Sequence, residues 1–160
     1  MKPEPDKLGA LIDTARALET AGVPYALIGG LAVGIHTNLP RATIDVDVAA
    51  HLGTGRESAV KALERAGLKK TGEFEHSVNF RHASGEPVQL AFDTAFDAMI
   101  ERADRVDLGG IDIMVVRKDD LITMKQRAAA DPARRQSKRL SDQADMELLL
   151  CDVPGLDEGW

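Results

Sequence analysis

Apolar side chains recur along the chain with two spacings, one typical of helices and one typical of strands. In residues 5–21 they recur every three or four positions, which predicts an amphipathic helix. The segment Ala21-Gly22-Val23-Pro24 ends this helix, because glycine and proline interrupt helical backbone. The apolar run Tyr25–Ile28 then predicts a buried strand. Further segments predict a helix at 30–36, a loop at 37–40, a strand at 42–49 and a helix that begins at Thr54 or Ser58 and ends near 66.

The rest of the chain begins with strand patterns and ends with helical ones. Two hairpins are predicted, with strands at 77–81, 88–92, 105–108 and 111–116. The second hairpin closes through Gly109-Gly110, a strong two-residue turn signal. Helical spacing predicts the remaining elements at 96–103, 118–130 and 136–150. This order predicts an α+β fold, in which helices flank a mixed sheet and two more helices follow at the C-terminus.

Composition adds limits to this prediction. The 160 residues are 44% hydrophobic and 29% charged, which is ordinary for a globular protein and enough for one domain, expected at 1–151 with a loose tail at 152–160. The net charge of −6 argues against nonspecific nucleic-acid binding as the main function. The single cysteine excludes an intrachain disulfide and a zinc site built of cysteines. No signal peptide or membrane span is recognisable, so we expect a cytoplasmic protein.

The candidate chemistry lies in one stretch, where a glycine pair precedes two aspartates. Gly29-Gly30 follows the strand Tyr25–Ile28 and precedes a helix, and glycines at such a junction let backbone N–H groups approach a phosphate. Asp45 and Asp47 are two residues apart on the next predicted strand, so their side chains point to the same face about 6–7 Å apart. Together the two features predict a polyphosphate beside a divalent cation. The alternatives are an ordinary glycine turn and a solvated strand face.

The glycine pair and the D-x-D strand resemble the signature of the polymerase-β-like nucleotidyltransferases. The segment Arg41-x-Thr43-x-Asp45 resembles the form common in small bacterial members, which include AbiEii-type toxins and stand-alone domains. Asp120-Leu121 leading to Lys125, and Asp142-x-x-Asp145 near the end, extend the resemblance over about residues 8–150. It implies a nucleotidyltransferase fold and a nucleoside triphosphate substrate.

The resemblance also implies roles for individual residues. Asp45 and Asp47 would be catalytic and would hold Mg²⁺ or Mn²⁺. The remaining implied contacts are to the triphosphate, from Gly29, Gly30, Arg41, Thr43 and Lys125. For Arg41, Thr43 and Lys125 the alternative is an ordinary surface or strand residue. His36 and the basic cluster of Arg127, Arg134, Arg135, Lys138 and Arg139 read first as structural or solvated side chains, although the cluster suits a triphosphate or RNA as well.

One position departs from the family pattern. Family members carry a third carboxylate on the strand after the hairpin turn, and Gln89 stands there in this chain. An amide oxygen can coordinate a cation, so Gln89 stays a candidate metal ligand, but an amide cannot accept a proton as a base. Asp93 shares the strand face with Gln89 but follows it by about 13 Å of strand.

Two functions follow from the resemblance. The first is metal-dependent transfer of a nucleoside monophosphate from a triphosphate to a hydroxyl of a protein, RNA or small molecule. The alternative, favoured by Gln89, is a degenerate nucleotide-binding module or one half of a toxin–antitoxin pair. No membrane partner is expected, and the leucine-rich face of the last helix suits either internal packing or a second copy of the chain.

Overall fold

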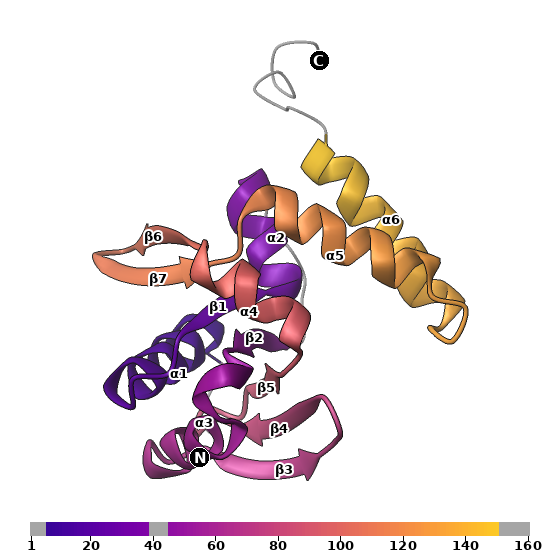
Figure 1. Ribbon diagram of the computed structural model, residues 1–160. Helices are drawn as coiled ribbons and strands as arrows, with labels where there is room; N and C mark the ends of the chain where they lie inside the picture. The colour runs from indigo at the N-terminus through magenta and orange to yellow at the C-terminus, as the bar shows by residue number, and fades with distance from the viewer. Residues whose placement is uncertain (1–5, 39–44, 151–160) are drawn as a thin grey trace.

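A mixed β-sheet forms the centre of the protein (Figure 1). The computed structural model describes residues 6–38 and 45–150, and within them seven strands follow the order β3-β4-β5-β2-β1-β7-β6. Strand β1 pairs with β7 and β2 pairs with β5 in parallel, and the other pairs are antiparallel. The strands are β1 (Tyr25–Ile28), β2 (Val46–Ala50), β3 (Lys69–Glu73), β4 (Ser77–Arg81), β5 (Pro87–Ala91), β6 (Asp104–Leu108) and β7 (Ile111–Val115).

Helices cover the centre of this sheet. In the described residues they are α1 (Lys7–Thr20), α2 (Gly29–Thr37), α3 (Arg56–Arg65), α4 (Thr94–Glu101), α5 (Lys118–Ala130) and α6 (Gln136–Leu150), with a short 3-10 turn at Leu52–Thr54. Ala26 and Ala49 on one sheet face lie against Met99 of α4 and Met124 of α5. Val48 points to the opposite face and is also buried, so the central strands are covered on both faces. The predicted mixed sheet flanked by helices is confirmed.

Strand β3 is one element that the apolar pattern did not predict. It reads Lys-Lys-Thr-Gly-Glu and lies at the edge of the sheet, where four of its five residues are exposed. An exposed edge strand needs no alternating apolar residues, and charged side chains there discourage pairing with other chains. The two predicted hairpins are both present, as β4–β5 and as β6–β7 closed by Gly109-Gly110.

Some predictions concern parts of the chain outside the described residues. These are the first residue of the N-terminal helix, the start of the 42–49 strand and the tail at 152–160. Among the described helices, none combines the length and the apolar character that crossing a membrane requires.

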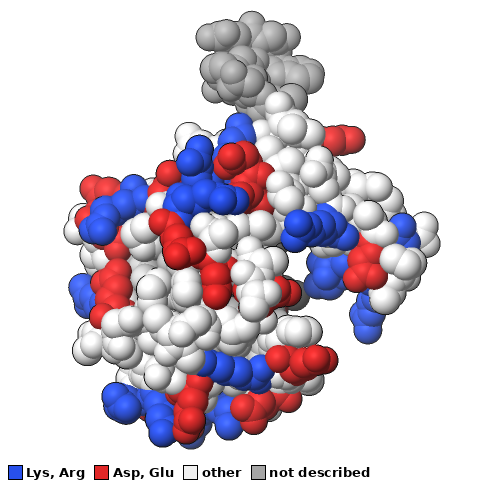
Figure 2. Space-filling model, in the orientation of Figure 1, with Lys and Arg blue, Asp and Glu red and all other residues white. Residues whose placement is uncertain are grey.

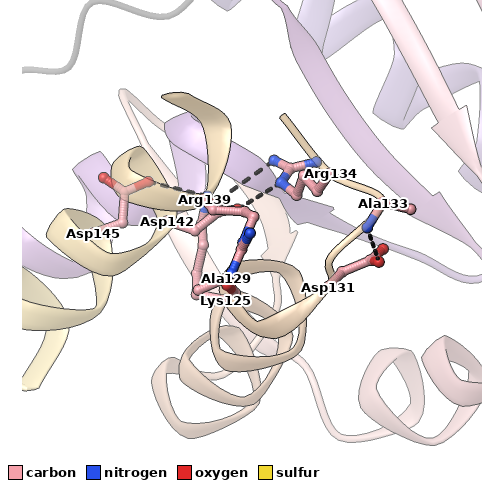
Figure 3. A network of polar contacts seen from close by, with 8 residues as sticks. All are labelled: Lys125, Ala129, Asp131, Ala133, Arg134, Arg139, Asp142 and Asp145. Carbon is pink, nitrogen blue, oxygen red and sulfur yellow. Dashed lines mark hydrogen bonds and ion pairs between the residues drawn. The ribbon is translucent and has the colours of Figure 1, made fainter. Parts of the chain in front are cut away.

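The two C-terminal helices are held together by buried charges (Figure 3). The Nζ atom of Lys125 on α5 lies 3.1 Å from Asp142 Oδ1 and 3.0 Å from Asp145 Oδ2, and both aspartates are on α6. Arg134, in the turn between the helices, donates from Nε to Asp142 Oδ2 at 2.7 Å. Asp142 and Asp145 are almost completely buried, so they depend on these cations. The network fixes α6 against α5.

Helix α5 is in turn fixed to the segment after α4. The guanidinium of Arg102 donates from Nε to Asp120 Oδ2 at 2.7 Å and from Nη2 to Asp120 Oδ1 at 2.5 Å. This two-pronged geometry restrains orientation as well as distance. The α5–α6 hairpin is therefore held at a defined position beside the sheet.

Replacing Lys125 by methionine should lower the free energy of unfolding by about 3–5 kcal/mol, because both buried aspartates lose their ion pair with Lys125 and Asp142 is left with Arg134. Urea denaturation measures this loss. Lys138→Met is the matched control, since Lys138 is exposed on α6, and it should change stability by less than about 0.5 kcal/mol. Lys125→Met should also be less harmful when Asp145→Asn is already present. Equal effects of the Lys125 and Lys138 variants would contradict this account of the network.

Candidate functional site

Gly29 and Asp47 touch where strand β1 gives way to helix α2. Gly29 has a φ of +72°, in the left-handed region that favours glycine. Ile28, the last residue of β1, is the register partner of Asp47 on β2. A Cβ atom at Gly29 would lie only 2.4 Å from Asp47 Oδ2 and 3.0 Å from Asp47 Cβ. Glycine is therefore required here by backbone conformation and by the closeness of the carboxylate.

The Asp47 carboxylate is poorly compensated by the protein. Its Oδ1 atom is buried and has no hydrogen-bond partner in the described part of the chain. Burial, and next the charge of Asp45, raise the pKa of Asp47 to about 6, while Lys125 and Lys138 act in the opposite direction. A buried carboxylate without a donor is costly when ionised, so this position favours a bound cation.

Gln89 lies beside Asp47 on the neighbouring strand. The two residues are register partners in the parallel pair of β2 and β5, so their side chains share one face of the sheet. Asp93 comes after β5 has ended, where its Oδ1 caps helix α4 by accepting from the N–H of Ala95 at 2.9 Å. Over the described residues, no three side chains of the His, Cys, Asp or Glu type come together as metal ligands. On this side of the cavity, the described residues offer the carboxylates of Asp45 and Asp47 and the amide of Gln89 as oxygen donors.

A cavity of about 490 Å³ opens in front of these residues. Asp45, Asp47 and Gln89 line one side of it. The α5–α6 hairpin lines the other side with Lys125, Arg127, Arg134, Lys138 and Asp142. Figure 2 shows Lys and Arg side chains gathered at this end of the molecule, around the hollow between the hairpin and the main body. The cavity thus has an acidic wall on the sheet and a largely basic wall on the hairpin.

The cavity brings together most of the residues that the sequence singled out. Gly29, Asp45, Asp47, Gln89 and Lys125 all line it, and Asp93 does too. Gly30 lies in the first turn of α2, outside the set of described residues that line the cavity. Arg41 and Thr43 lie outside the described residues.

The sequence left open whether the basic cluster is a solvated surface or a place for a triphosphate or RNA. Arg127, Arg134 and Lys138 line the cavity, although their pattern alone favoured a solvated surface. A usable signal was present, because Lys138 and Asp142 are four residues apart and therefore share a helix face with each other. Their closeness to Asp47 depends on the folding back of α6, which no local pattern reveals.

Solved structures with a similar fold include two named as adenylyltransferases or as adenylyl complexes. The lincosamide antibiotic adenylyltransferase LnuA, bound to lincomycin, superposes with a TM-score of 0.61 at 14% identity, over 93% of this chain and 98% of that chain. ANT(2")-Ia in complex with adenylyl-2"-tobramycin superposes with a TM-score of 0.61 at 15% identity, over 88% of this chain and 86% of that chain. An antigenic nucleotidyltransferase-like protein from Paracoccidioides brasiliensis superposes with a TM-score of 0.58 at 19% identity, over 92% of this chain and 77% of that chain. At such identities the likeness establishes the fold.

A family comparison goes further than the fold. No curated protein sequence matches this chain. One family model, described as "Nucleotidyltransferase of unknown function (DUF6036)", matches residues 6–151. The expected nucleotidyltransferase superfamily is thereby confirmed, and the narrower AbiEii-type placement stays a prediction. Because the match spans nearly the whole sequence, the chain belongs to this nucleotidyltransferase family.

Proposed function

We propose that the protein transfers a nucleoside monophosphate from a nucleoside triphosphate to an acceptor hydroxyl, with a divalent cation held by Asp45 and Asp47. The hydroxyl oxygen bonds to the α-phosphorus, the α–β phosphoanhydride bond breaks, and pyrophosphate leaves. The observation that carries this proposal is the Asp47 side chain, which packs against Gly29 and lines a cavity with basic residues on its far wall. Its Oδ1 is buried and has no hydrogen-bond partner among the described residues. A carboxylate in this position is costly unless a cation binds it. The basic wall provides the matching place for phosphate.

The donor set fits Mg²⁺ or Mn²⁺ when a triphosphate is also bound. Mg²⁺ is commonly held by one or two carboxylates together with substrate phosphates, rather than by a full set of protein ligands. Asp45 and Asp47 supply two carboxylates, and Gln89 in register with Asp47 offers a neutral amide oxygen. Mn²⁺ accepts the same oxygen donors.

The protein's own groups would position the reactants. Backbone N–H groups at Gly29-Gly30, in the first turn of α2, are available to a phosphate. Lys125 has three N–H donors and pairs with two carboxylates, which leaves one donor for a phosphate. Arg41 and Thr43 remain proposed phosphate contacts. When bound, the metal ion would offset phosphate charge and lower the pKa of the acceptor hydroxyl.

The named functions of the structural neighbours support this reaction class. LnuA is named as a lincosamide antibiotic adenylyltransferase, and the ANT(2")-Ia structure holds adenylyl-2"-tobramycin. Both names describe a nucleoside monophosphate joined to a small molecule. A small-molecule acceptor is therefore as suitable as a protein or an RNA for this chain.

A second candidate function is nucleotide binding without transfer. Gln89 favours it, because an amide beside Asp47 cannot accept the hydroxyl proton. Such a module would sense a nucleotide or act as one half of a toxin–antitoxin pair, and either role admits a protein partner or a second copy of the chain.

Label transfer tests the first function against the second. The protein is incubated with Mg²⁺ or Mn²⁺, each α-labelled nucleoside triphosphate, and total RNA or cell lysate as acceptor. Label should be transferred, and Asp45→Asn or Asp47→Asn should reduce transfer by about a hundredfold or more, because transition-state charge is no longer offset. Asp112→Asn is the control, since Asp112 is exposed on β7, and it should leave transfer unchanged.

The variant Gln89→Asp separates the remaining outcomes. Nucleotide binding without transfer, followed by transfer once Gln89→Asp is made, would establish the degenerate module. Absence of both binding and transfer with every nucleotide would exclude both functions.

Gly29→Ala should abolish transfer, because its Cβ would collide with the Asp47 side chain. Gly22 provides a matched control: its φ is +71° and an added Cβ meets no atom within 4 Å. Both substitutions should cost about 1–2 kcal/mol of stability from the left-handed backbone alone. Thermal unfolding measures that shared loss of stability, and the label-transfer assay measures the difference in activity between the Gly29 and Gly22 variants. Similar activity in the two variants would show that the contact with Asp47 is unimportant.

The raised pKa of Asp47 predicts a pH-dependent stability of the metal-free protein. The folded chain binds this proton more tightly than the unfolded chain, since the pKa is about 6 instead of 3.8. The stabilisation from protonated Asp47 is therefore complete below 3.8 and is lost as the pH rises through about 6. Asp47→Asn is neutral throughout and should melt at a higher temperature than the unchanged protein near pH 8, with little difference near pH 4. An equal difference in melting temperature at both pH values would contradict this assignment.

A further inference from the structure

Two basic side chains on the hairpin wall of the cavity have no carboxylate partner. Arg127 on α5 and Lys138 on α6 both line the cavity, and both are exposed. Throughout the described residues, neither side chain forms an ion pair or a hydrogen bond. Their charges are therefore available to a ligand in the cavity.

The other two cations on this wall are already balanced. Lys125 pairs with Asp142 and Asp145, and Arg134 pairs with Asp142. Both of these cations are therefore already engaged within the hairpin. Among the described residues of the hairpin wall, Arg127 and Lys138 are the basic side chains left to face Asp45 and Asp47 across the cavity.

Helix stability does not account for the position of Lys138. It lies in the first turn of α6, which contains no acidic residue, and Arg134 and Arg135 directly precede that helix. The positive end of a helix dipole favours acidic side chains in the first turn and disfavours basic ones. Basic residues gathered at this end suit an anion bound in front of it.

The two walls face the same cavity. Lys138 on α6 and Asp47 on β2 both line it, although the two residues are 91 positions apart in the sequence. A ligand that joins a cation at Asp47 to Lys138 therefore has to span only the cavity.

We infer that Arg127 and Lys138 bind the polyphosphate tail of the nucleotide, across the cavity from the aspartate pair. The inference rests on the proposed function, and it assigns phosphate recognition to two residues outside the glycine pair and Lys125. A polyphosphate matches this arrangement because it is compact, carries several negative charges and ligates a divalent cation with the same oxygens that accept from Lys and Arg. A nucleic-acid surface would call on basic residues outside the cavity as well, such as Arg135.

Calorimetry with inorganic tripolyphosphate and Mg²⁺ tests the inference without depending on the base or the acceptor. Arg127→Gln and Lys138→Gln should each weaken binding about tenfold, the value of one charge-assisted hydrogen bond. Lys138→Arg should retain most of the affinity. Arg135→Gln is the matched control, since Arg135 lies between α5 and α6, directly before Lys138's helix, but does not line the cavity. The affinity of this variant should stay within about twofold of the unchanged protein. Melting temperatures confirm that each variant is folded.

Several results would overturn the inference. The first is unchanged tripolyphosphate binding in the Arg127 and Lys138 variants, and the second is an equal loss in Arg135→Gln. The third, from a filter-binding measurement with total RNA, is that these variants lose RNA binding while tripolyphosphate binding stays intact. The fourth is no tripolyphosphate binding by the unchanged protein. Label transfer judges the proposed function separately. Transfer that depends on Asp45 but not on Arg127 or Lys138 would leave the function standing and the inference refuted. If these variants weaken tripolyphosphate binding but no transfer is detected, the inference stands and the proposed transfer function is refuted.

Discussion

The close approach of the Gly29 backbone to the Asp47 carboxylate is the constraint on which the site depends. It brings the end of β1 and the start of α2 against a carboxylate on β2, leaving one carboxylate oxygen buried without a donor. Side chains in the neighbouring described positions do not relieve this cost, because Ile28 is apolar and the Gln89 amide makes no hydrogen bond to this oxygen. The Asp47 carboxylate, which favours a bound cation, therefore lies next to the N-terminus of α2, where a phosphate is favoured.

The α5–α6 hairpin completes the site from outside the sheet. Its internal charges are balanced by the network of Lys125, Arg134, Asp142 and Asp145, which holds the two helices in fixed relation. Arg127 and Lys138 take no part in this network among the described residues, and both line the cavity. We propose that they bind the ligand, whereas Lys125 serves both the network and the phosphate.

Local patterns were sufficient for much of the fold and for part of the site. The apolar run at Tyr25–Ile28 and the turn at Gly109-Gly110 specified a buried strand and a hairpin, because each depends on neighbouring residues only. Strand β3 was not predicted from the apolar pattern, because an exposed edge strand needs no alternation of apolar residues. Asp45, Asp47 and Gly29 stood out through spacing. Lys138 did not, because its place opposite Asp47 arises from the packing of distant helices.

A crystal structure of the protein with Mn²⁺ and a non-hydrolysable nucleoside triphosphate would test the central claim most directly. Anomalous scattering locates the metal independently of any assumption about catalysis. We expect a peak within coordination distance of both Asp45 and Asp47, about 2.0–2.2 Å from their oxygens, with phosphate oxygens completing the shell beside Gly29. A nucleotide bound elsewhere, or a metal ion that contacts neither aspartate, would contradict it.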